Sequence, residues 1–342
     1  MVRAGKHGEY EQRFLQTNRI YVCWTGLKHD LSKLAEKPDL RELLARVYPE
    51  SPKKRVSHST GQIWPFVREM KPGDWVVTPS KIKPSVNIAE ITGGYGFDPE
   101  AQESAYHHRP VKWIARDIPR SVIDQDLLYS LGAFMTICRI ERNDAEKRFR
   151  KMSAAGWKAT ATSPLMIETS EGLETEGGVD LEQLARDQIA KMIIQKLQGH
   201  GLVTLVRAVL DAQGYTTYMS REGPDKGIDI LAAPGPLGFG RPRICVQVKS
   251  SDAPVDSPTL NQLIGSMQNC HAEQGLLVSW SGFKASVDKE IPAQFFRVRL
   301  WDQDALIGEV LAHYDRLNED LRAEFPLKRI WTVAAQDDEV AE

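Results

Sequence analysis

Three polar side chains with complementary chemistry flank two apolar stretches of this chain. Asp229 stands near the start of IDILAAP, while Gln247 and Lys249 alternate with valines in ICVQVKS. Side chains two positions apart share one face of a strand, so Gln247 and Lys249 point the same way, with Val246 and Val248 on the opposite, core-facing side. If the Gly- and Pro-rich segment between the stretches closes a hairpin, Asp229 lies beside Gln247. The pattern then gathers a carboxylate, an amide and an ammonium group.

Such a group could hydrolyse a phosphodiester with the help of a metal. The Asp229 carboxylate, the Gln247 amide oxygen and the Val248 backbone carbonyl are oxygen ligands suited to Mg²⁺, with Mn²⁺ as the alternative ion. The ion would polarise a phosphoryl oxygen and lower the pKa of a bound water. Lys249 would orient or deprotonate that water, or stabilise developing charge. The short spacing alone is equally compatible with a solvated strand face.

Helices and strands alternate around these residues. An apolar helical repeat covers residues 181–197, with Asp180 as N-cap and Gln183 as its box partner. A second apolar stripe from Leu202 to Leu210 stops at Gly214. Four strands and two helices follow: GIDILAAP, RICVQVKS, QGLLVSWS and FFRVRLWD as strands, SPTLNQLIGSMQNCHAE and SVDKEIPAQ as helices. We predict an α/β domain with a mixed sheet over residues 181–335.

The first part of the chain has a different pattern. Residues 1–150 hold short strand-like runs rich in Val, Ile and Trp, closed by Gly and Pro turns and joined by short helices. Several short strands of this kind indicate a small β-barrel. Residues 151–180 are rich in Ser, Thr, Gly and Glu and are predicted to be a linker. The fold class is therefore α+β in the first domain and α/β in the second.

Composition limits the class of protein. The 342 residues suffice for two domains, and the formal net charge of -2 means that any nucleic-acid binding must depend on local basic patches. No segment is apolar enough to span a bilayer or to serve as a secretory signal. The four cysteines show no C-x-x-C spacing, which argues against a zinc site or a disulfide scaffold. These features predict a cytoplasmic protein without a membrane partner.

The segment GYTTYMSREGPDKGIDIL followed by CVQVKS resembles the catalytic domain of Mrr-type restriction endonucleases, within the P-D-(D/E)-x-K nuclease fold. Matching features are Gly214-Tyr215, an Asp-x-Gly-x-Asp motif from Asp225 to Asp229, and the Gln-x-Lys motif. The resemblance covers residues 195–312. It implies a restriction-endonuclease-like mixed sheet flanked by helices, with Asp229 as metal ligand, Lys249 as catalytic lysine and Asp225 as supporting acid. Asp225 could equally be a turn residue beside Gly227.

One departure weakens that resemblance. The family often carries Phe-Glu early in its first catalytic helix, and this Glu helps to bind the metal. The chain has Leu202 and Val203 at that point. Glu222 or another carboxylate would have to replace the missing acid, so catalytic competence is the property to test first.

The segments QIWPFVREMKPGDWVVTPSK, NIAEITGGYGF and HHRPVKWIARDIPR resemble domains of the PUA-like superfamily, including the EVE group. That resemblance covers residues 18–142 and implies nucleic-acid binding, in some relatives with a flipped modified base in an aromatic pocket. Such a pocket needs a stacking surface and basic residues for the flanking phosphates. The candidates are Trp24, Trp64, Tyr95, Phe97, Lys81 and Arg109. Each aromatic residue could instead fill the core, and the run Pro52–Arg55 could be a phosphate contact or a solvated loop.

We therefore expect a DNA endonuclease of a restriction or antiviral defence system, dependent on base modification and on a divalent metal. Its partners would be double-stranded DNA, with or without modified bases, and a second copy in a homodimer, for which the helix over residues 181–197 is a candidate interface. The alternatives are a catalytically weakened DNA- or RNA-binding module, or a ligand-gated defence nuclease. His107-His108 could be metal ligands but fit an ordinary loop pair better.

Overall fold

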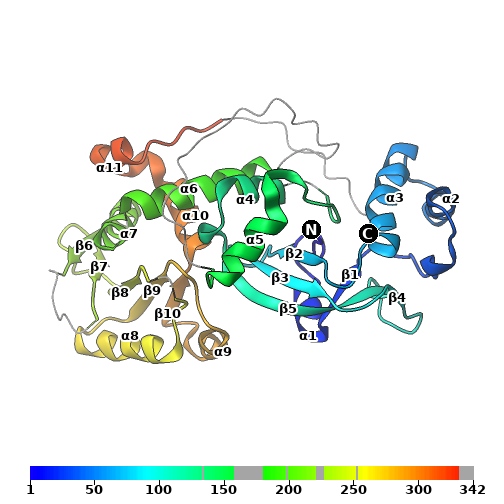
Figure 1. Cartoon of the computed structure of the whole chain (residues 1–342). Helices are drawn as coiled ribbons and strands as arrows, with labels where there is room; N and C mark the ends of the chain where they lie inside the picture. The colour runs from blue at the N-terminus through cyan, green and yellow to red at the C-terminus, as the bar shows by residue number, and fades with distance from the viewer. Residues whose placement is uncertain (133–134, 158–179, 198, 221–226, 252, 331–342) are drawn as a thin grey trace. The chain divides into compact units, whose positions relative to one another are not determined.

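The computed structural model describes residues 1–132, 135–157, 180–197, 199–220, 227–251 and 253–330. The described chain divides into unit 1, within Met1–Leu184, and unit 2, within Ala185–Thr332. Each unit has its own mixture of helices and strands (Figure 1). In the described part of the chain, no helix is both long and apolar enough to cross a bilayer.

Unit 1 is built on a curled antiparallel sheet. The strand order is β1-β5-β3-β2, and the short β4 also pairs with β5. The strands are β1 (Arg19–Val22), β2 (Trp75–Pro79), β3 (Ser85–Ile91), β4 (Gly96–Phe97) and β5 (His107–Pro119). Within the described residues β1 and β2 remain the edges of this order, so the sheet is a curled half-barrel, whereas the strand pattern predicts a small β-barrel.

Helices cover this sheet on both faces and create two cores. One core includes Ile20, Ile91 and Val111 from the sheet and Phe14, Leu44 and Phe66 from helices. The other includes Val86, Ile88 and Ile118 from the sheet and Leu127 and Phe149 from helices. The helices are α1 (Glu11–Thr17), α2 (Lys37–Val47), α3 (Lys53–Arg68), α4 (Gln125–Leu131) and α5 (Ala145–Ala154), with 3-10 turns η1 (Leu31–Lys33), η2 (Arg120–Val122) and η3 (Arg142–Asp144).

Unit 1 differs from the sequence prediction in two segments. The run Pro52–Arg55 is not a loop, because Pro52 caps α3 and the basic residues form its first turn. The predicted linker starts too early, because α5 continues to Ala154. Residues 158–179 of that linker lie outside the described residues.

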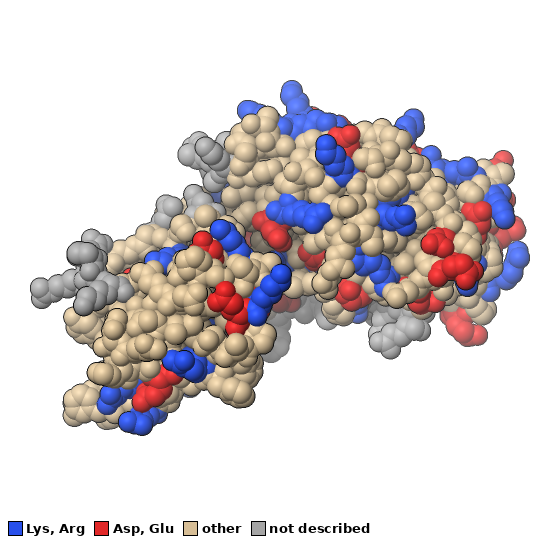
Figure 2. All heavy atoms as spheres, turned by 90° about the horizontal axis from the view of Figure 1, so that it is seen from below, with Lys and Arg blue, Asp and Glu red and all other residues tan. Residues whose placement is uncertain are grey.

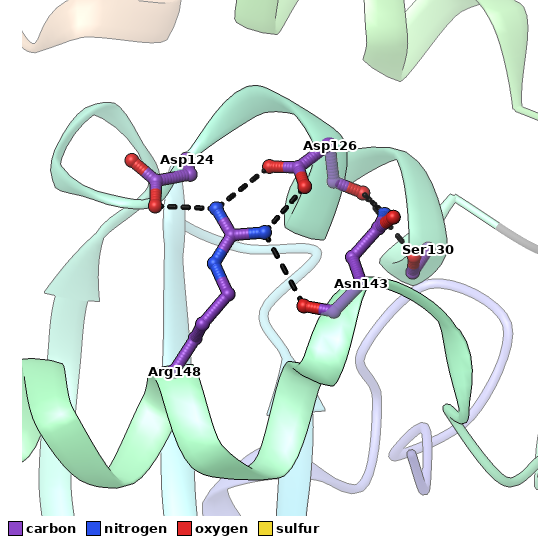
Figure 3. Close-up of polar contacts among 5 residues, drawn as sticks. All are labelled: Asp124, Asp126, Ser130, Asn143 and Arg148. Atoms are coloured by element: carbon purple, nitrogen blue, oxygen red, sulfur yellow. Dashed lines mark hydrogen bonds and ion pairs between the residues drawn. The ribbon is translucent and has the colours of Figure 1, made fainter. Parts of the chain in front are cut away.

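A polar cluster joins α4 to α5 (Figure 3). Arg148 on α5 donates to both carboxylate oxygens of Asp126, and it donates to Asp124 at 2.5 Å. Asn143 donates its side-chain amide to the Asp126 carbonyl, and Arg148 donates in turn to the Asn143 carbonyl. The paired carboxylates raise the pKa of Arg148, so this guanidinium stays charged. The cluster therefore holds the turn before α5 against the start of α4.

Unit 2 has a mixed five-stranded sheet with strand order β10-β9-β8-β7-β6. Strands β6 (Tyr215–Met219), β7 (Ile230–Pro234) and β8 (Ile244–Lys249) are antiparallel neighbours. Strands β8, β9 (Gln274–Ser279) and β10 (Val298–Trp301) are parallel. The predicted mixed sheet is present, and β6 is a further strand beyond the four that the sequence predicts.

Helices cover both faces of this sheet as well. Helices α6 (Leu181–Leu197), α7 (His200–Ala212) and α10 (Gln303–His313) share a core with Ile230, Val246 and Val248. Helices α8 (Ser257–Asn269) and α9 (Ala285–Gln294) share the other core with Cys245 and Leu277. The chain also forms η4 (Tyr314–Arg316) and α11 (Glu319–Glu324). Gln183 donates its backbone N–H to Asp180, as the predicted cap requires.

The apolar side of α6 is used within its own unit. Ile189, Ile193 and Leu197 are buried in the core that α6 shares with α7. This arrangement accounts for the apolar repeat over residues 181–197 without a second chain. Gly214 follows α7 with φ +97°, a left-handed conformation that glycine adopts at no steric cost, so the predicted helix stop is confirmed.

Candidate functional site

The β7–β8 hairpin brings Asp229 to β8 as the sequence predicts. Ile230 pairs with Val246, and Asp229 donates its backbone N–H to the Val246 carbonyl at 3.0 Å. The Asp229 Oδ2 atom accepts the Val248 N–H at 2.7 Å. The carboxylate is therefore held next to the backbone between Gln247 and Lys249, and its Oδ1 atom has no hydrogen-bond partner among the described residues.

Val248 turns its backbone toward Asp229. The neighbouring Lys249 carbonyl accepts from Trp280 on the β9 side, and backbone groups of successive residues in a strand alternate in direction. The carbonyl of Val248 consequently faces the same side as its N–H, which is the side of Asp229. The predicted pairing of the Asp229 carboxylate with the Val248 carbonyl is compatible with this geometry.

Gln247 is fully buried, although one face of its strand could have been solvated. Helix α8 covers that face, and Cys245 on the same face is buried too. The Gln247 Nε2 atom donates to Gln262 Oε1 on α8 at 3.5 Å. The Gln247 Oε1 atom is buried and has no partner in the described structure. A buried oxygen without a donor is costly, so this atom is the strongest local indication of a ligand such as a cation.

Gly227 is required where the chain enters this site. It has φ +79°, and a Cβ atom there would lie 2.8 Å from Gln262 Nε2 and 3.0 Å from Gln247 Nε2. Any larger residue would push both amides apart. Glycine at this position therefore lets the chain approach the two glutamines closely. Asp225, the predicted supporting acid, and Glu222, the predicted substitute acid, lie outside the described residues.

Lys249 ends β8, two residues beyond Gln247 and on the same face by strand alternation. Its side chain is half-buried and forms no ion pair or hydrogen bond within the described chain. The ammonium group is therefore not committed to holding the fold together. An uncommitted cation at the end of the strand that carries Gln247 suits an anionic substrate such as a phosphodiester.

The residues present fit a divalent cation through oxygen atoms alone. Asp229 Oδ1, Gln247 Oε1 and the Val248 carbonyl are the available ligands, and all are hard donors of the kind that Mg²⁺ prefers. Over the described ranges, no three or more His, Cys, Asp or Glu side chains form a metal-binding group. Leu202 is buried in the core and Val203 packs against it, so the helix acid typical of the resembling family is absent here.

Most of the aromatic candidates in unit 1 meet around one core. Trp24 is buried and donates from Nε1 to Ser59, while Trp64 and Tyr95 pack against the same cluster. Phe97 and Tyr95 both contact the ring of His107. Trp64 also carries the guanidinium of Arg68 over its ring at 5.7 Å. The partly buried faces of Trp64, Tyr95 and Phe97 therefore remain candidates for stacking, whereas Trp24 serves mainly as core.

The two basic candidates are used by the fold. Arg109 is buried and donates to the carbonyls of Phe66 at 2.5 Å, Val67 at 3.0 Å and Gly93 at 3.4 Å. It satisfies carbonyls at the end of α3 that lack a helical partner, so this guanidinium is bound within the fold. Lys81 pairs with Asp180 at 2.9 Å. On the face drawn in Figure 2, acidic and basic side chains are interspersed rather than gathered by sign.

His107 has a structural position that its sequence context did not indicate. It is the first residue of β5, fully buried, and not part of a loop. Its Nε2 atom lies 2.6 Å from the Leu27 carbonyl and therefore donates, while Nδ1 accepts from the Tyr95 hydroxyl at 2.7 Å. Leu31 N–H donates to the same hydroxyl. The neutral ring thus ties the segment after β1 to β4 and β5.

This network predicts acid sensitivity of unit 1. Burial lowers the pKa of His107 from its ordinary 6.5 to about 4, so the unfolded chain binds the proton more readily between these values. The stabilisation is complete above pH 6.5 and is lost as the pH falls toward 4, by up to roughly 3 kcal/mol. The free energy of unfolding of wild type and His107→Gln, measured by denaturant titration from pH 7 to pH 4, should converge. If the free energies of unfolding of the two proteins instead fell in parallel with pH, the neutral state of the buried His107 ring would not be the source of the acid sensitivity.

Comparison with known families agrees with the geometry of unit 2. Residues 194–310 match the family model Mrr_cat, described as a restriction endonuclease. Residues 2–139 match a domain of unknown function, DUF8426, so a PUA-like identity is not confirmed. No curated protein matches the chain.

Two solved structures share features with the chain. The DNA modification-dependent restriction endonuclease AspBHI is 15% identical, with 71% of this chain and 60% of that chain covered and a TM-score of 0.32. MspJI restriction endonuclease in complex with a 27-mer oligonucleotide is 13% identical, with 90% and 73% covered and a TM-score of 0.31. The chain thus spans less than two thirds of AspBHI.

Proposed function

We propose, from the match of residues 194–310 to a restriction endonuclease family model, that this protein hydrolyses the phosphodiester backbone of double-stranded DNA with a divalent metal. The observation that carries the proposal is the unpartnered, buried Gln247 oxygen on the strand whose Val248 N–H holds the Asp229 carboxylate. Asp229, Gln247 and the Val248 carbonyl would hold the ion, Mg²⁺ or Mn²⁺. When bound, the ion would supply Lewis-acid polarisation of the phosphate and acidify a water.

The chain's own residues supply orientation and charge. The Val248 N–H fixes one oxygen of Asp229 and leaves the other free. Gln262 fixes the amide of Gln247 so that its oxygen, rather than its nitrogen, is available. Lys249 would attract the scissile phosphate and stabilise the negative charge that grows on it during attack by water. Asp225 would support the site as an additional acid.

Incubation of the full chain with plasmid DNA tests this function. We expect cleavage with Mg²⁺ or Mn²⁺ and none with a chelator. The substrates should include unmodified, methylated and hydroxymethylated DNA, because a nuclease that depends on modification would leave unmodified plasmid intact. Absence of metal-dependent cleavage from every substrate would favour the alternative, a DNA- or RNA-binding module without catalytic activity.

We propose that unit 1 selects the DNA. The half-buried rings of Trp64, Tyr95 and Phe97 can stack on an extruded base, which is how proteins read modified bases outside the helix. A binding series with the full chain and the same three kinds of duplex, without metal, measures this selection apart from cleavage. Equal affinity for all three duplexes would remove base reading from the proposal, and tighter binding of single-stranded RNA would favour an RNA-directed role.

Gln262 should tune the metal requirement of the site. Gln262→Ala removes the acceptor that orients Gln247, and the loss of one hydrogen bond of about 1 kcal/mol corresponds to an increase of roughly fivefold in the Mg²⁺ concentration for half-maximal cleavage. The rate at saturating Mg²⁺ should change little, because Gln262 would act on Gln247 and not on the substrate. Gln262→Glu keeps an acceptor oxygen and should return the Mg²⁺ concentration for half-maximal cleavage to that of wild type.

Gln268→Ala is the matched control for this prediction, since Gln268 is exposed on the same helix. If Gln262→Ala instead lowered only the saturated rate, Gln262 would act on the substrate and not on Gln247.

A further inference from the structure

Strand β6 forms one edge of the sheet in unit 2. It pairs with β7, and in the same register Ser220 donates its N–H to the backbone carbonyl of Asp229. Because hydrogen-bonded pairs alternate along antiparallel strands, the backbones of Thr216 and Tyr218 face β7. The backbones of Tyr215, Thr217 and Met219 face outward. Across the described residues, these three have no backbone hydrogen bond on the outer side.

This edge lacks the usual protection against pairing with another strand. The sequence of β6 is YTTYM, which contains no Lys, Asp, Glu or Pro. Charged residues and proline are the common devices that keep an exposed strand edge from pairing. Tyrosine and threonine, in contrast, favour strand pairing through their side chains. The edge is therefore open along its backbone, while the Thr217 hydroxyl is bound by Arg207 and Asp211 of its own unit.

An apolar loop extends the same surface. The loop between β7 and β8 exposes 73% of Leu237 and 76% of Phe239, while Tyr218 on β6 is 62% exposed. Thr216 donates its hydroxyl to the Gly235 carbonyl at 2.7 Å, and Gly238 lies against Thr216, so the loop is attached to the strand. Arg241 at the base of the loop is paired with Glu273. We call strand β6 together with Leu237 and Phe239 the β6 surface.

We propose that the β6 surface joins two copies of this chain through antiparallel pairing of their β6 strands. The outward row of Tyr215, Thr217 and Met219 is centred on Thr217, so a two-fold axis at Thr217 satisfies every outward group in both chains. This register sets Tyr218 opposite the partner subunit's Thr216, an aromatic and β-branched pair of the stabilising type. The two sheets join into one, and the apolar loops cover the junction.

A second copy is the occupant that this edge fits best. The match is reciprocal, because each chain offers the same uncharged row and receives the same row in return. The dimer would also carry two copies of the site at Asp229, which allows both strands of a duplex to be cut. That functional consequence rests on the proposed nuclease activity, whereas the pairing itself rests on the strand edge.

Sedimentation equilibrium of the metal-free full chain tests the interface without reference to cleavage. We expect a dimer whose dissociation constant rises at least about tenfold in Tyr218→Lys, which corresponds to about 1.4 kcal/mol of pairing energy. Ile82→Lys, at an apolar position of unit 1 with 63% exposure, is the matched control and should leave the dimer unchanged. A monomeric wild type, or a dimer that is insensitive to Tyr218→Lys, would overturn the proposal.

Cross-linking tests the register. The double variant Thr216→Cys with Tyr218→Cys should form two disulfides across the axis, because such non-hydrogen-bonded pairs have Cα atoms about 4.5 Å apart, within the range that a disulfide bridges. Thr216→Cys alone should form none, since its opposite residue is Tyr218. Wild type under the same oxidation controls for the four native cysteines. Cross-linking in the single variant and not in the double variant would reject this register.

Discussion

Lys249→Ala should lower the rate of DNA cleavage at least about 100-fold and leave the free energy of unfolding unchanged. The first effect follows from the role proposed for the ammonium, which is to stabilise the charge that develops on the phosphate. The second follows from its surroundings, because the Lys249 side chain is bound to no other residue of the described chain.

The measurement combines initial rates at saturating Mg²⁺ with denaturant unfolding of the same preparations. Lys289→Ala is the matched control, because Lys289 is an exposed lysine on α9 in the same unit. Lys249→Arg keeps the charge but spreads it over a planar group, and we expect it to recover only part of the rate. A variant that cleaves normally would remove Lys249 from the mechanism. A variant that unfolds would show that this lysine stabilises the domain.

The hairpin that carries the candidate site could be predicted because its pattern is local. Asp229, Gln247 and Lys249 lie on two strands joined by a Gly- and Pro-rich loop, and strand alternation alone fixes which side chains share a face. The hydrogen bond from Val248 to Asp229 follows from that pairing. The burial of Gln247 does not follow from it, since α8 covers this face through contacts between residues far apart in sequence.

The positions of three other side chains depend on tertiary contacts and could not be predicted from the sequence. The sequence around Arg109 is typical of a surface cation, but its guanidinium is buried, where it donates to carbonyls at the end of α3 that have no helical partner. His107 sits in a polar sequence, yet it is buried because Leu27 and Tyr95 satisfy both ring nitrogens. Gln262 belongs to an ordinary helical pattern, and only the depth at which α8 packs brings it to Gln247.

Strand β6 was missed for a different reason. Its five residues follow directly on α7 after Gly214, which is too short a run for alternation to separate a strand from the frayed end of a helix. Pairing with β7 supplies the missing information, because the register from Tyr215 to Met219 fixes the strand. The same pairing determines that the backbone groups of Tyr215, Thr217 and Met219 face outward.

Asp229→Asn should abolish metal-dependent cleavage while the fold is retained. Asparagine keeps an oxygen that can accept the Val248 N–H, so the hairpin stays intact. Its amide nitrogen would occupy the position of the free carboxylate oxygen and present hydrogens to the cation. Mutation of groups that only orient a metal ligand already lowers metal affinity roughly 10–100-fold. We therefore expect substitution of the ligand itself to lower the affinity for Mg²⁺ at least about 100-fold. Activity is measured over rising Mg²⁺ concentrations.

The outcome at high Mg²⁺ also decides how complete the site is. The chain lacks the helix acid at Leu202 and Val203, so Asp229 is the one carboxylate that the described site contributes. If no other acid substitutes, Asp229→Asn leaves a site without negative charge, and added Mg²⁺ should not restore cleavage. Recovery at high Mg²⁺ would mean that a further carboxylate, such as Asp225, shares the ion. Asp288→Asn on α9 controls for the loss of an exposed charge, and cleavage that survives Asp229→Asn unchanged would reject this metal site.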